Sequence, residues 1–149
     1  MVGGKVPRIS LRAEKQFLQT VASIVGSGLA ESAHDISKGG LAVAAAEMAI
    51  LGRRGVSIDL DKVPTKASRL DQQLFSESKP RIILESKAKN TARILRRLKT
   101  AKINAAKIGR VEGKEIFIES HANPIVQIPL EEATDVWSRT LSRAMEAEL

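Results

Sequence analysis

Apolar residues in the segment that follows Ser10 recur at the spacing of an amphipathic helix. Five of them form one face: Phe17, Leu18, Val21, Ile24 and Val25. Ser10 is a suitable N-cap for this helix, because its hydroxyl can accept a hydrogen bond from a free first-turn amide. Gly26 and Gly28 are placed to end it. The pattern therefore predicts a first helix with one buried face.

A second helix is predicted to begin at Gly40, and it has a different pattern. Nearly every residue from 41 to 51 is apolar, and Glu47 is the strongly polar exception. A helix that is apolar on nearly every side is buried in its protein. The stretch is also shorter than the roughly 18 apolar residues that a membrane span requires, so we expect no membrane segment.

Strand patterns follow. Val56, Ile58 and Leu60 alternate with polar residues, which predicts a half-buried strand that Pro64 interrupts. A loop or short helix is expected up to Phe75. The apolar run at 82–84 predicts a more fully buried strand. Further strands are predicted at 108–111, 115–119 and 125–128.

Two more helices are predicted in the second half of the chain. Residues 88–99 form a basic helix whose expected inner face consists of Ala88, Ala92, Leu95 and Leu98. The last helix starts near Pro129, where the absence of an N–H group costs little. Its expected packing stripe consists of Leu130, Ala133, Trp137, Leu141 and Ala144.

These elements predict an α+β fold. We expect residues 10–149 to form a single domain, with a mixed or antiparallel sheet of four to six strands and helices packed on it. Residues 1–9 are interpreted as a lead-in segment. With 149 residues, of which 43% are hydrophobic, the chain is long enough for one domain with its own core.

The composition excludes several classes of function. The chain has no cysteine, which rules out disulfides, a thiolate zinc site and a cysteine nucleophile. Together with the lack of a recognisable secretion signal, this predicts a cytoplasmic protein. Aromatic residues are scarce, with three Phe, one Trp and no Tyr, so the core is expected to consist of Ala, Val, Ile and Leu.

The net charge of +7 raises the alternative of a nucleic-acid-binding module. Seven basic residues without an intervening acid lie in one stretch: Lys87, Lys89, Arg93, Arg96, Arg97, Lys99 and Lys102. The chain nevertheless has no aromatic stacking platform and no known nucleic-acid motif. We therefore interpret the basic helix as a solvated face or a docking site for an acidic partner domain, and we do not expect a nucleic-acid partner.

Residues 33–42 carry the most informative motif, Ala-His-Asp-Ile-Ser-Lys-Gly-Gly-Leu-Ala. Glycines before a buried helix allow a phosphate to approach the free amides of its first turn. Asp35 could hold a Mg²⁺ ion that bridges to the same phosphates, and Lys38 could add charge. The alternative is a structural turn, with Ser37 as an N-cap and with His34 and Asp35 hydrogen-bonded inside the fold. The spacing by itself leaves both open.

The segment His-Asp-Ile-Ser-Lys-Gly-Gly-Leu-Ala at 34–42 closely resembles the corresponding motif of the phosphoribosylformylglycinamidine synthases. A second match follows in Leu-Phe-Ser-Glu-Ser-Lys-Pro-Arg at 74–81, and the closing helix with Trp137 is similar to the Trp-bearing C-terminal helix of those enzymes. The resemblance covers most of the chain from Glu31 onward. It implies the C-terminal domain of the second half of such an enzyme, with a fold like that of aminoimidazole ribonucleotide synthetase. Another ATP-dependent member of this superfamily is the closest alternative.

The resemblance also implies a reaction for the whole enzyme, a carbon–nitrogen ligase of purine biosynthesis. ATP activates the amide oxygen of formylglycinamide ribonucleotide as an iminophosphate, and ammonia from a glutaminase subunit displaces phosphate to form the amidine. The N-terminal domain, which supplies most ATP and metal ligands and the catalytic His, and the first half of the enzyme are not recognisable in this sequence. They and the glutaminase are the implied partners, and this chain is expected to be inactive alone.

For individual residues, the resemblance implies a second, pseudo-symmetric site that holds a structural nucleotide, ATP or ADP, with Mg²⁺. The expected nucleotide or phosphate ligands are Asp35, Ser37, Lys38, Gly39 and Gly40, with Asp35 also as the metal ligand. The candidates on the substrate side are Ser76, Glu77, Ser78, Lys79 and Arg81, and no catalytic residue is assigned. A decayed nucleotide site in a purely structural module is a further alternative.

Some of these residues have open alternatives. The family usually has an acid where this chain has Lys38, which favours a direct lysine–phosphate contact over metal binding there. Glu77 is a substrate ligand or a cap at the start of a strand. Arg81 is a phosphate ligand or a structural partner of Glu77. Trp137 is interpreted as core or interface packing, and His121 as an exposed loop residue.

Overall fold

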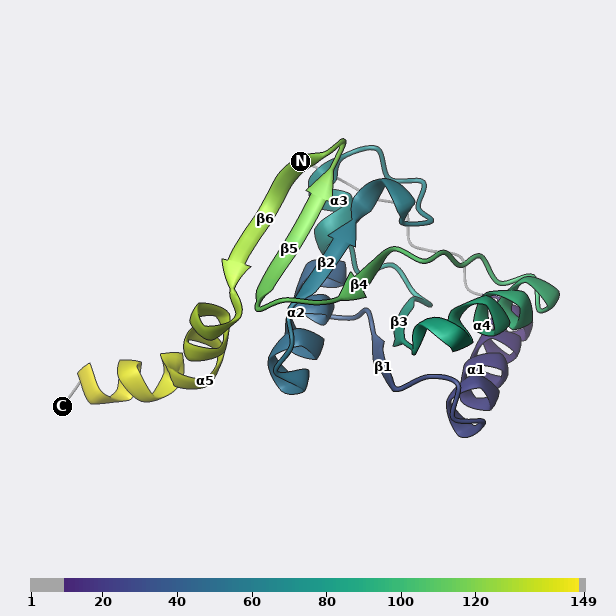
Figure 1. Cartoon of the computed structure of the whole chain (residues 1–149), viewed down its shortest axis with the longest axis horizontal. Helices are drawn as coiled ribbons and strands as arrows, with labels where there is room; N and C mark the ends of the chain where they lie inside the picture. The colour runs from purple at the N-terminus through teal and green to yellow at the C-terminus, as the bar shows by residue number, and fades with distance from the viewer. Residues whose placement is uncertain (1–9, 148–149) are drawn as a thin grey trace. The chain divides into compact units, whose positions relative to one another are not determined.

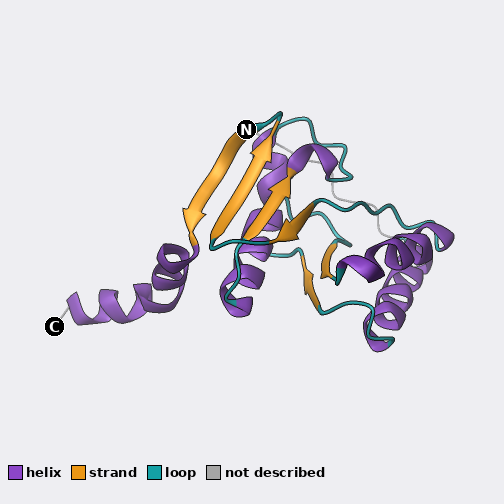
Figure 2. Ribbon diagram, in the orientation of Figure 1, coloured by secondary structure: helices purple, strands orange, loops and turns teal. Residues whose placement is uncertain are grey.

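The computed structural model describes residues 10–147, so the expected lead-in segment at 1–9 lies outside the described residues. The helices are α1 Leu11–Gly26, α2 Gly40–Gly52, the 3₁₀ helix η1 Leu60–Lys62, α3 Leu70–Phe75, α4 Ala88–Thr100 and α5 Leu130–Ala147 (Figure 1). The strands are β1 Ser32–Asp35, β2 Val56–Asp59, β3 Ile82–Glu85, β4 Gly109–Val111, β5 Glu115–Ser120 and β6 Asn123–Pro129 (Figure 2).

The chain divides into two compact units, each made of two separate segments. Unit 1 contains residues 1–44 and 64–107, and unit 2 contains residues 45–63 and 108–149. The first division falls inside α2, between Ala44 and Ala45.

Unit 1 contains a two-stranded antiparallel sheet and the packed helices α1 and α4. β1 pairs with β3 in a register that places Asp35 opposite Ile82. α1 and α4 lie side by side (Figure 1). Their contact is closed by a cluster of four buried residues, Ile24, Leu29, Ile94 and Leu98. Burial of these aliphatic side chains is the main force that holds the unit together.

The structure confirms the predicted boundaries of the first helix, but only part of its predicted apolar face is buried. The Ser10 hydroxyl accepts a hydrogen bond from the Ala13 amide at 3.4 Å, and Gly28 adopts a positive φ of 65° just after the helix. Leu18 and Val25, expected on the inner face, are 59% and 43% exposed. α1 packs mainly on a single neighbouring helix, so only a narrow stripe of its surface is covered.

The inner face of α4 was predicted incorrectly in part. Leu98 is buried and Leu95 is half-buried, as expected, but Ala88 and Ala92 are exposed. Ile94, outside the predicted face, is buried instead. Each residue turns the helix by about 100°, so the partner helix covers the side centred on Ile94 and Leu98. A sequence pattern with apolar residues on both sides could not distinguish these faces.

Unit 2 is built on a four-stranded mixed sheet with the order β4-β2-β5-β6. β2 runs parallel to β5, and the pairs β2–β4 and β5–β6 are antiparallel. The alternating pattern buries Ile58 and Ile118 on one face of the sheet, next to Ile116. The mixed sheet within an α+β fold is therefore confirmed. The described strands form two sheets, however, and β3, predicted as a more fully buried strand, is only half-buried because its sheet has just two strands.

The last helix leaves the sheet of unit 2 after its first turns (Figure 1). Leu130 is buried and Ala133 is partly buried against the cluster around Ala49, Ile50 and Ile116. Farther along the predicted stripe, Trp137 is 55% exposed and Leu141 is 74% exposed. The expectation that Trp137 belongs to the core of this chain is therefore wrong, and interface packing of this residue stays a prediction.

The Ala-rich helix α2 is confirmed as largely buried, and its buried apolar residues are Leu41, Ala44, Ala45, Ala49 and Ile50. The three alanines among them have small side chains, which allow neighbouring atoms to approach the helix backbone closely. Within residues 10–147, no helix combines the length and the hydrophobicity needed to cross a membrane.

Candidate functional site

The motif at 37–40 forms a tight turn in unit 1. The Gly40 amide donates a hydrogen bond to the Ser37 carbonyl oxygen at 3.1 Å, which closes a four-residue β-turn. Gly39, the third residue of the turn, has a φ of +77°. A positive φ at this position is the mark of a type II turn, and glycine adopts it without steric cost. The turn leads directly into α2.

The register of the small sheet brings this turn to the second motif. Because β1 and β3 are antiparallel, the end of β1 lies beside the start of β3. The Ile36 amide donates to the Arg81 carbonyl oxygen at 3.0 Å, and the Gly39 amide donates to Glu77 Oε1 at 3.1 Å. The structure therefore brings together two sequence-predicted groups of site residues, 35–40 and 76–81, although almost forty residues separate them in the chain.

The structure corrects the expectation that both glycine amides are free for a ligand. The Gly39 amide is paired with Glu77 and the Gly40 amide with Ser37. Gly40 is also buried, and a Cβ built on it would lie 2.5 Å from the Leu74 carbonyl oxygen. A phosphate could reach the Gly39 amide only if the Glu77 carboxylate moved away. The side chains of Lys38 in the turn and of Asp35 at the end of β1 are exposed to solvent.

Arg81 contacts the backbone of its own loop rather than the Glu77 carboxylate. Its Nε donates to the Ser78 carbonyl oxygen at 3.0 Å, and its Nη2 donates to the Ser76 carbonyl oxygen and, at 3.3 Å, to Ser76 Oγ. Partial burial lowers the pKa of the Arg81 guanidinium from its usual value, but an arginine keeps its charge in proteins. These contacts support a structural role for Arg81 without assigning a ligand to it.

The remaining candidates differ in exposure. Ser37 and Ser76 are partly buried, whereas Ser78 and Lys79 are exposed at the surface of unit 1. His34 Nδ1 lies 2.7 Å from the Asp35 carbonyl oxygen, and since that oxygen can only accept, Nδ1 carries the proton of this bond. In the part of the chain that the structure describes, no three acidic or histidine side chains gather into a metal site. Asp35 is thus a single carboxylate, and Mg²⁺ sites in proteins often use only one or two, with phosphates and water as the other ligands.

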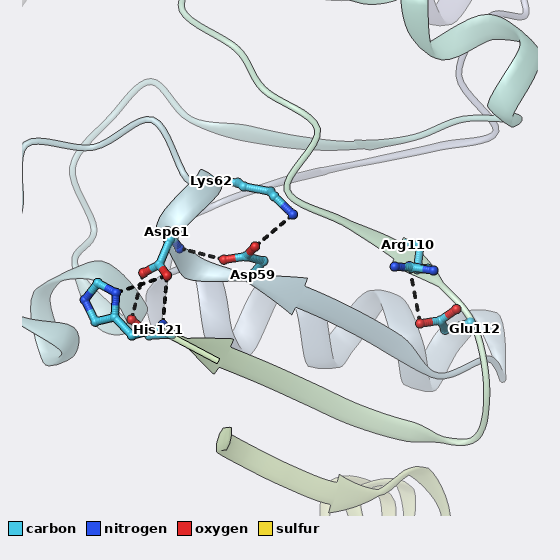
Figure 3. A network of polar contacts seen from close by, with 7 residues as sticks. Asp59, Asp61, Lys62, Arg110, Glu112 and His121 are labelled. Atoms are coloured by element: carbon cyan, nitrogen blue, oxygen red, sulfur yellow. Dashed lines mark hydrogen bonds and ion pairs between the residues drawn. The ribbon is translucent and has the colours of Figure 1, made fainter. Parts of the chain in front are cut away.

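A polar network in unit 2 was not predicted from the sequence (Figure 3). Asp61, which follows β2, accepts hydrogen bonds from the His121 amide at 2.7 Å and from Ser120 Oγ at 2.9 Å. His121 Nδ1 also lies 3.2 Å from the Asp61 carboxylate. Asp59 forms an ion pair with Lys62 at 2.8 Å beside it. The contact fixes the β5–β6 turn to η1, sixty residues earlier, and no local signal in the sequence reports such a pairing.

This network predicts a pH effect on stability. The hydrogen bond from the His121 amide, followed by that from Ser120, lowers the pKa of Asp61 below its ordinary value. The folded state thus binds this proton less readily than the unfolded chain, and the stabilisation is complete above the unfolded pKa of about 3.9 and is lost as pH falls below it. In the Asp61→Asn variant, the stability should fall less as the pH is lowered than it does in the wild type. Acid denaturation followed by circular dichroism measures this difference. Ser120→Ala should act in the same direction with a smaller effect, and an unchanged acid profile for Asp61→Asn would contradict the assignment.

The basic helix α4 presents its cations to solvent in unit 1. Lys87 pairs with Glu31 at 3.5 Å, and Arg97 donates to Ser27 Oγ at 3.0 Å. The side chains of Lys89, Arg93, Arg96, Lys99 and Lys102 are exposed. The stretch from Lys87 to Lys102 is therefore a positively charged surface, and two of its seven cations are linked to neighbouring segments.

Curated relatives resemble the chain over nearly its whole length. The phosphoribosylformylglycinamidine synthase subunit PurL of Thermoanaerobacter sp. (strain X514) is 37% identical over 146 residues, which are 98% of this chain and 19% of the relative. The subunit PurL of Methanococcus aeolicus is 36% identical over 142 residues, or 95% of this chain and 19% of the relative. The chain thus spans about a fifth of the length of the relatives that it matches.

Solved structures share the fold. T. maritima PurL complexed with ATP superposes with a TM-score of 0.75 at 23% identity, over 81% of this chain and 21% of that one. The same protein complexed with FGAR gives a TM-score of 0.74 at 23% identity, over the same shares. The structure of PurLQS from Thermotoga maritima gives 0.75 at 23% identity, over 85% of this chain and 22% of that one.

The family model for the C-terminal domain of AIR synthase related proteins matches residues 3–120. That range includes the turn at 37–40, the loop at 76–81 and the first five strands. The chain belongs to the AIR synthase related protein family and corresponds to the C-terminal domain of these proteins.

Proposed function

We propose that this chain is the C-terminal domain of a phosphoribosylformylglycinamidine synthase, in its second half, and that residues 10–149 act there as one domain. The observation that carries the proposal is the 37% identity to a PurL subunit over 98% of the chain. The enzyme would be an ATP-dependent carbon–nitrogen ligase of purine biosynthesis. It would convert formylglycinamide ribonucleotide into its amidine with ammonia that a glutaminase releases.

The chain's own part in this reaction would be to complete a nucleotide or phosphate site. T. maritima PurL has been solved in complexes with ATP and with ADP. Here Lys38 would contact a phosphate as a point charge, and Ser37 could donate a hydrogen bond to it. Asp35 would supply the carboxylate for Mg²⁺, whose chemistry is to neutralise charge on bound phosphates. The Gly39 amide would join this site only after release of Glu77, and the Gly40 amide is held by the turn.

The substrate side of the site would lie at 76–81. Ser78 and Lys79 are exposed there, and the Glu77 carboxylate accepts a hydrogen bond from the Gly39 amide of the turn. Ser76 and Arg81 would support the loop, since the Arg81 side chain donates to the Ser78 carbonyl oxygen, the Ser76 carbonyl oxygen and the Ser76 hydroxyl. An N-terminal ATP-binding domain, the first half of the enzyme and a glutaminase subunit would be the partners. We place the assembly in the cytoplasm.

The basic face of α4 does not favour a second function. A sequence-reading helix needs a motif that directs side chains to base edges, and single-strand binding needs aromatic platforms. Unit 1 contains only two aromatic residues, Phe17 and Phe75, and neither lies on α4. We therefore propose that this face is solvated or contacts an acidic protein surface.

The proposal predicts that the isolated chain forms no amidine from ATP, formylglycinamide ribonucleotide and ammonia. Turnover requires the catalytic groups that the resemblance assigns to another domain. Phosphate release and amidine formation by the purified chain are the measurements. Steady turnover that a substitution within this chain abolishes, such as Asp35→Asn, would overturn the proposal in this form.

A domain-replacement experiment tests whether this chain can support the proposed reaction within a longer subunit. This chain would replace its counterpart in the PurL subunit of Thermoanaerobacter sp., and the hybrid would be assayed for ammonia-dependent amidine formation. Activity above that of the subunit lacking the segment is the expected result. Hybrids with Asp35→Asn or Lys38→Ala test the proposed ligands, and Lys107→Ala, at an exposed residue outside the motifs at 33–42 and 74–81, is the matched control. A folded hybrid without activity would count against the assignment.

A further inference from the structure

A closed ring of contacts links the two segments of the candidate site within unit 1. The Ile36 amide donates a hydrogen bond to the Arg81 carbonyl oxygen at 3.0 Å, and the Arg81 side chain donates to Ser76 and Ser78. The Gly39 amide donates to the Glu77 carboxylate at 3.1 Å, which closes the ring. One residue, Arg81, takes part in this ring through both its backbone and its side chain. The backbone contact extends the β1–β3 pairing, whereas the side-chain contacts lie beyond the sheet.

The side-chain contacts of Arg81 hold the backbone on both sides of Glu77. They are made to the carbonyl oxygens of Ser76 and Ser78, the residues that flank it. The guanidinium group is planar, with its donors in a fixed fork, so binding two carbonyls at once also fixes their mutual orientation. Fixed carbonyls on both sides hold the Glu77 backbone, and so set the direction in which its Cα–Cβ bond leaves the loop toward Gly39.

We infer that Arg81 is a positioning residue: by fixing residues 76–78 it directs the Glu77 carboxylate onto the Gly39 amide, and so joins the loop and the turn into one surface. Its importance for ligand binding rests on the function proposed above. The contact itself does not depend on that function. Among residues 10–147, the Arg81 side chain donates hydrogen bonds to Ser76 and Ser78 and to neither the turn side chains nor the Glu77 carboxylate, so it would act through Glu77.

A double-mutant cycle read at the Gly39 amide tests this inference. In the ¹⁵N-labelled chain, amide–water exchange of Gly39 would be measured by NMR for wild type, Glu77→Ala, Arg81→Met and the double variant. Loss of a hydrogen bond to a charged acceptor should accelerate exchange of this amide about tenfold or more. We expect that acceleration in each single variant. In the Glu77→Ala background, Arg81→Met should add no further acceleration, because its effect passes through Glu77.

Three further variants and readouts separate positioning from general destabilisation. Lys79→Met changes an exposed side chain of the same loop that forms no hydrogen bond or ion pair within residues 10–147, and it should leave Gly39 exchange at the wild-type rate. Arg81→Lys, which has one donor centre in place of a fork, should restore only part of the protection. Exchange at Ile118 in unit 2 should stay unchanged in all variants. If Arg81→Met does not fold, Arg81→Lys is judged by the same cycle.

Two results would overturn the inference. In the first, Gly39 exchange is unchanged in Arg81→Met. In the second, Arg81→Met accelerates it by the same factor whether or not Glu77 is present, which would mean that the loop merely loosens. No nucleotide or substrate enters these measurements. Failure of the amidine-forming assay would therefore leave the positioning role intact, and loss of the positioning role would leave the proposed reaction intact.

Discussion

Replacing Gly40 by alanine is expected to lower the free energy of unfolding by about 3 kcal/mol, through overpacking and an unfavourable φ together. Gly40 has a φ of +68°, which costs an alanine energy by itself. A Cβ at this position would also lie 2.5 Å from the Leu74 carbonyl oxygen and 2.6 Å from Phe75 backbone atoms. These are backbone atoms at the end of α3, so no side-chain rotation can relieve the overlap. Urea unfolding followed by circular dichroism measures the change.

Gly28 supplies the matched control for this variant. Its φ of +65° is nearly the same, but no atom lies within 4 Å of a Cβ built on it. Gly28→Ala should therefore cost only the conformational term, about 1 kcal/mol. The difference between the two variants isolates the close approach of α3. If both variants lose the same stability, the packing of Gly40 against α3 is not as described.

Replacing Ile118 by alanine is expected to destabilise unit 2 by about 3 to 4 kcal/mol, within the range for large-to-small substitutions in a core. Ile118 is fully buried at the centre of β5, between its neighbours Ile58 on β2 and Val126 on β6. Truncation removes apolar burial and leaves a cavity that the two flanking strands cannot fill without moving. Hydrogen exchange of the β2 and β5 amides, together with thermal unfolding, measures the loss.

Ile125 on β6 is the control for Ile118, because it is 37% exposed. Ile125→Ala should cost less than about 1 kcal/mol, since its side chain is already partly solvated. Ile118→Val, which removes one methyl group, should fall between the two at about 1 kcal/mol. Equal losses for Ile118→Ala and Ile125→Ala would contradict the assignment of Ile118 to the core.

Local patterns were sufficient for most elements of this fold. The N-cap at Ser10, the start of the buried helix at Gly40 and the alternation from Val56 to Leu60 each follow from interactions within a few residues. The motif at 33–42 and the one at 74–81 also indicated the candidate site. β1 was missed because Ser32–Asp35 has no alternating apolar pattern, and it forms a strand only because β3 supplies its partner.

Faces and partners required the tertiary structure. Ala92 and Ile94 both suit the inside of a helix, and the position of α1 against α4 decided which of them is covered. Trp137 lies on an apolar stripe that a sequence assigns to a core, but α5 extends beyond the sheet that buries Leu130. A pattern records which residues prefer burial, and burial itself depends on what the rest of the chain places there.

The sequence by itself determined the α+β class, most of the helices and strands, and the two motifs that lie together in unit 1, because each depends on short-range periodicity or on residues adjacent in the chain. The tertiary structure alone decided that the Gly39 amide is paired with Glu77, that Arg81 holds the backbone of residues 76–78, and that Asp61 is bonded to the His121 amide. The physical reason is that a hydrogen bond requires donor and acceptor within about 3 Å at a suitable angle. For Gly39 and Asp61, strand pairing brings together residues that are dozens of positions apart; for Arg81, the fold of the loop sets the direction of a guanidinium group.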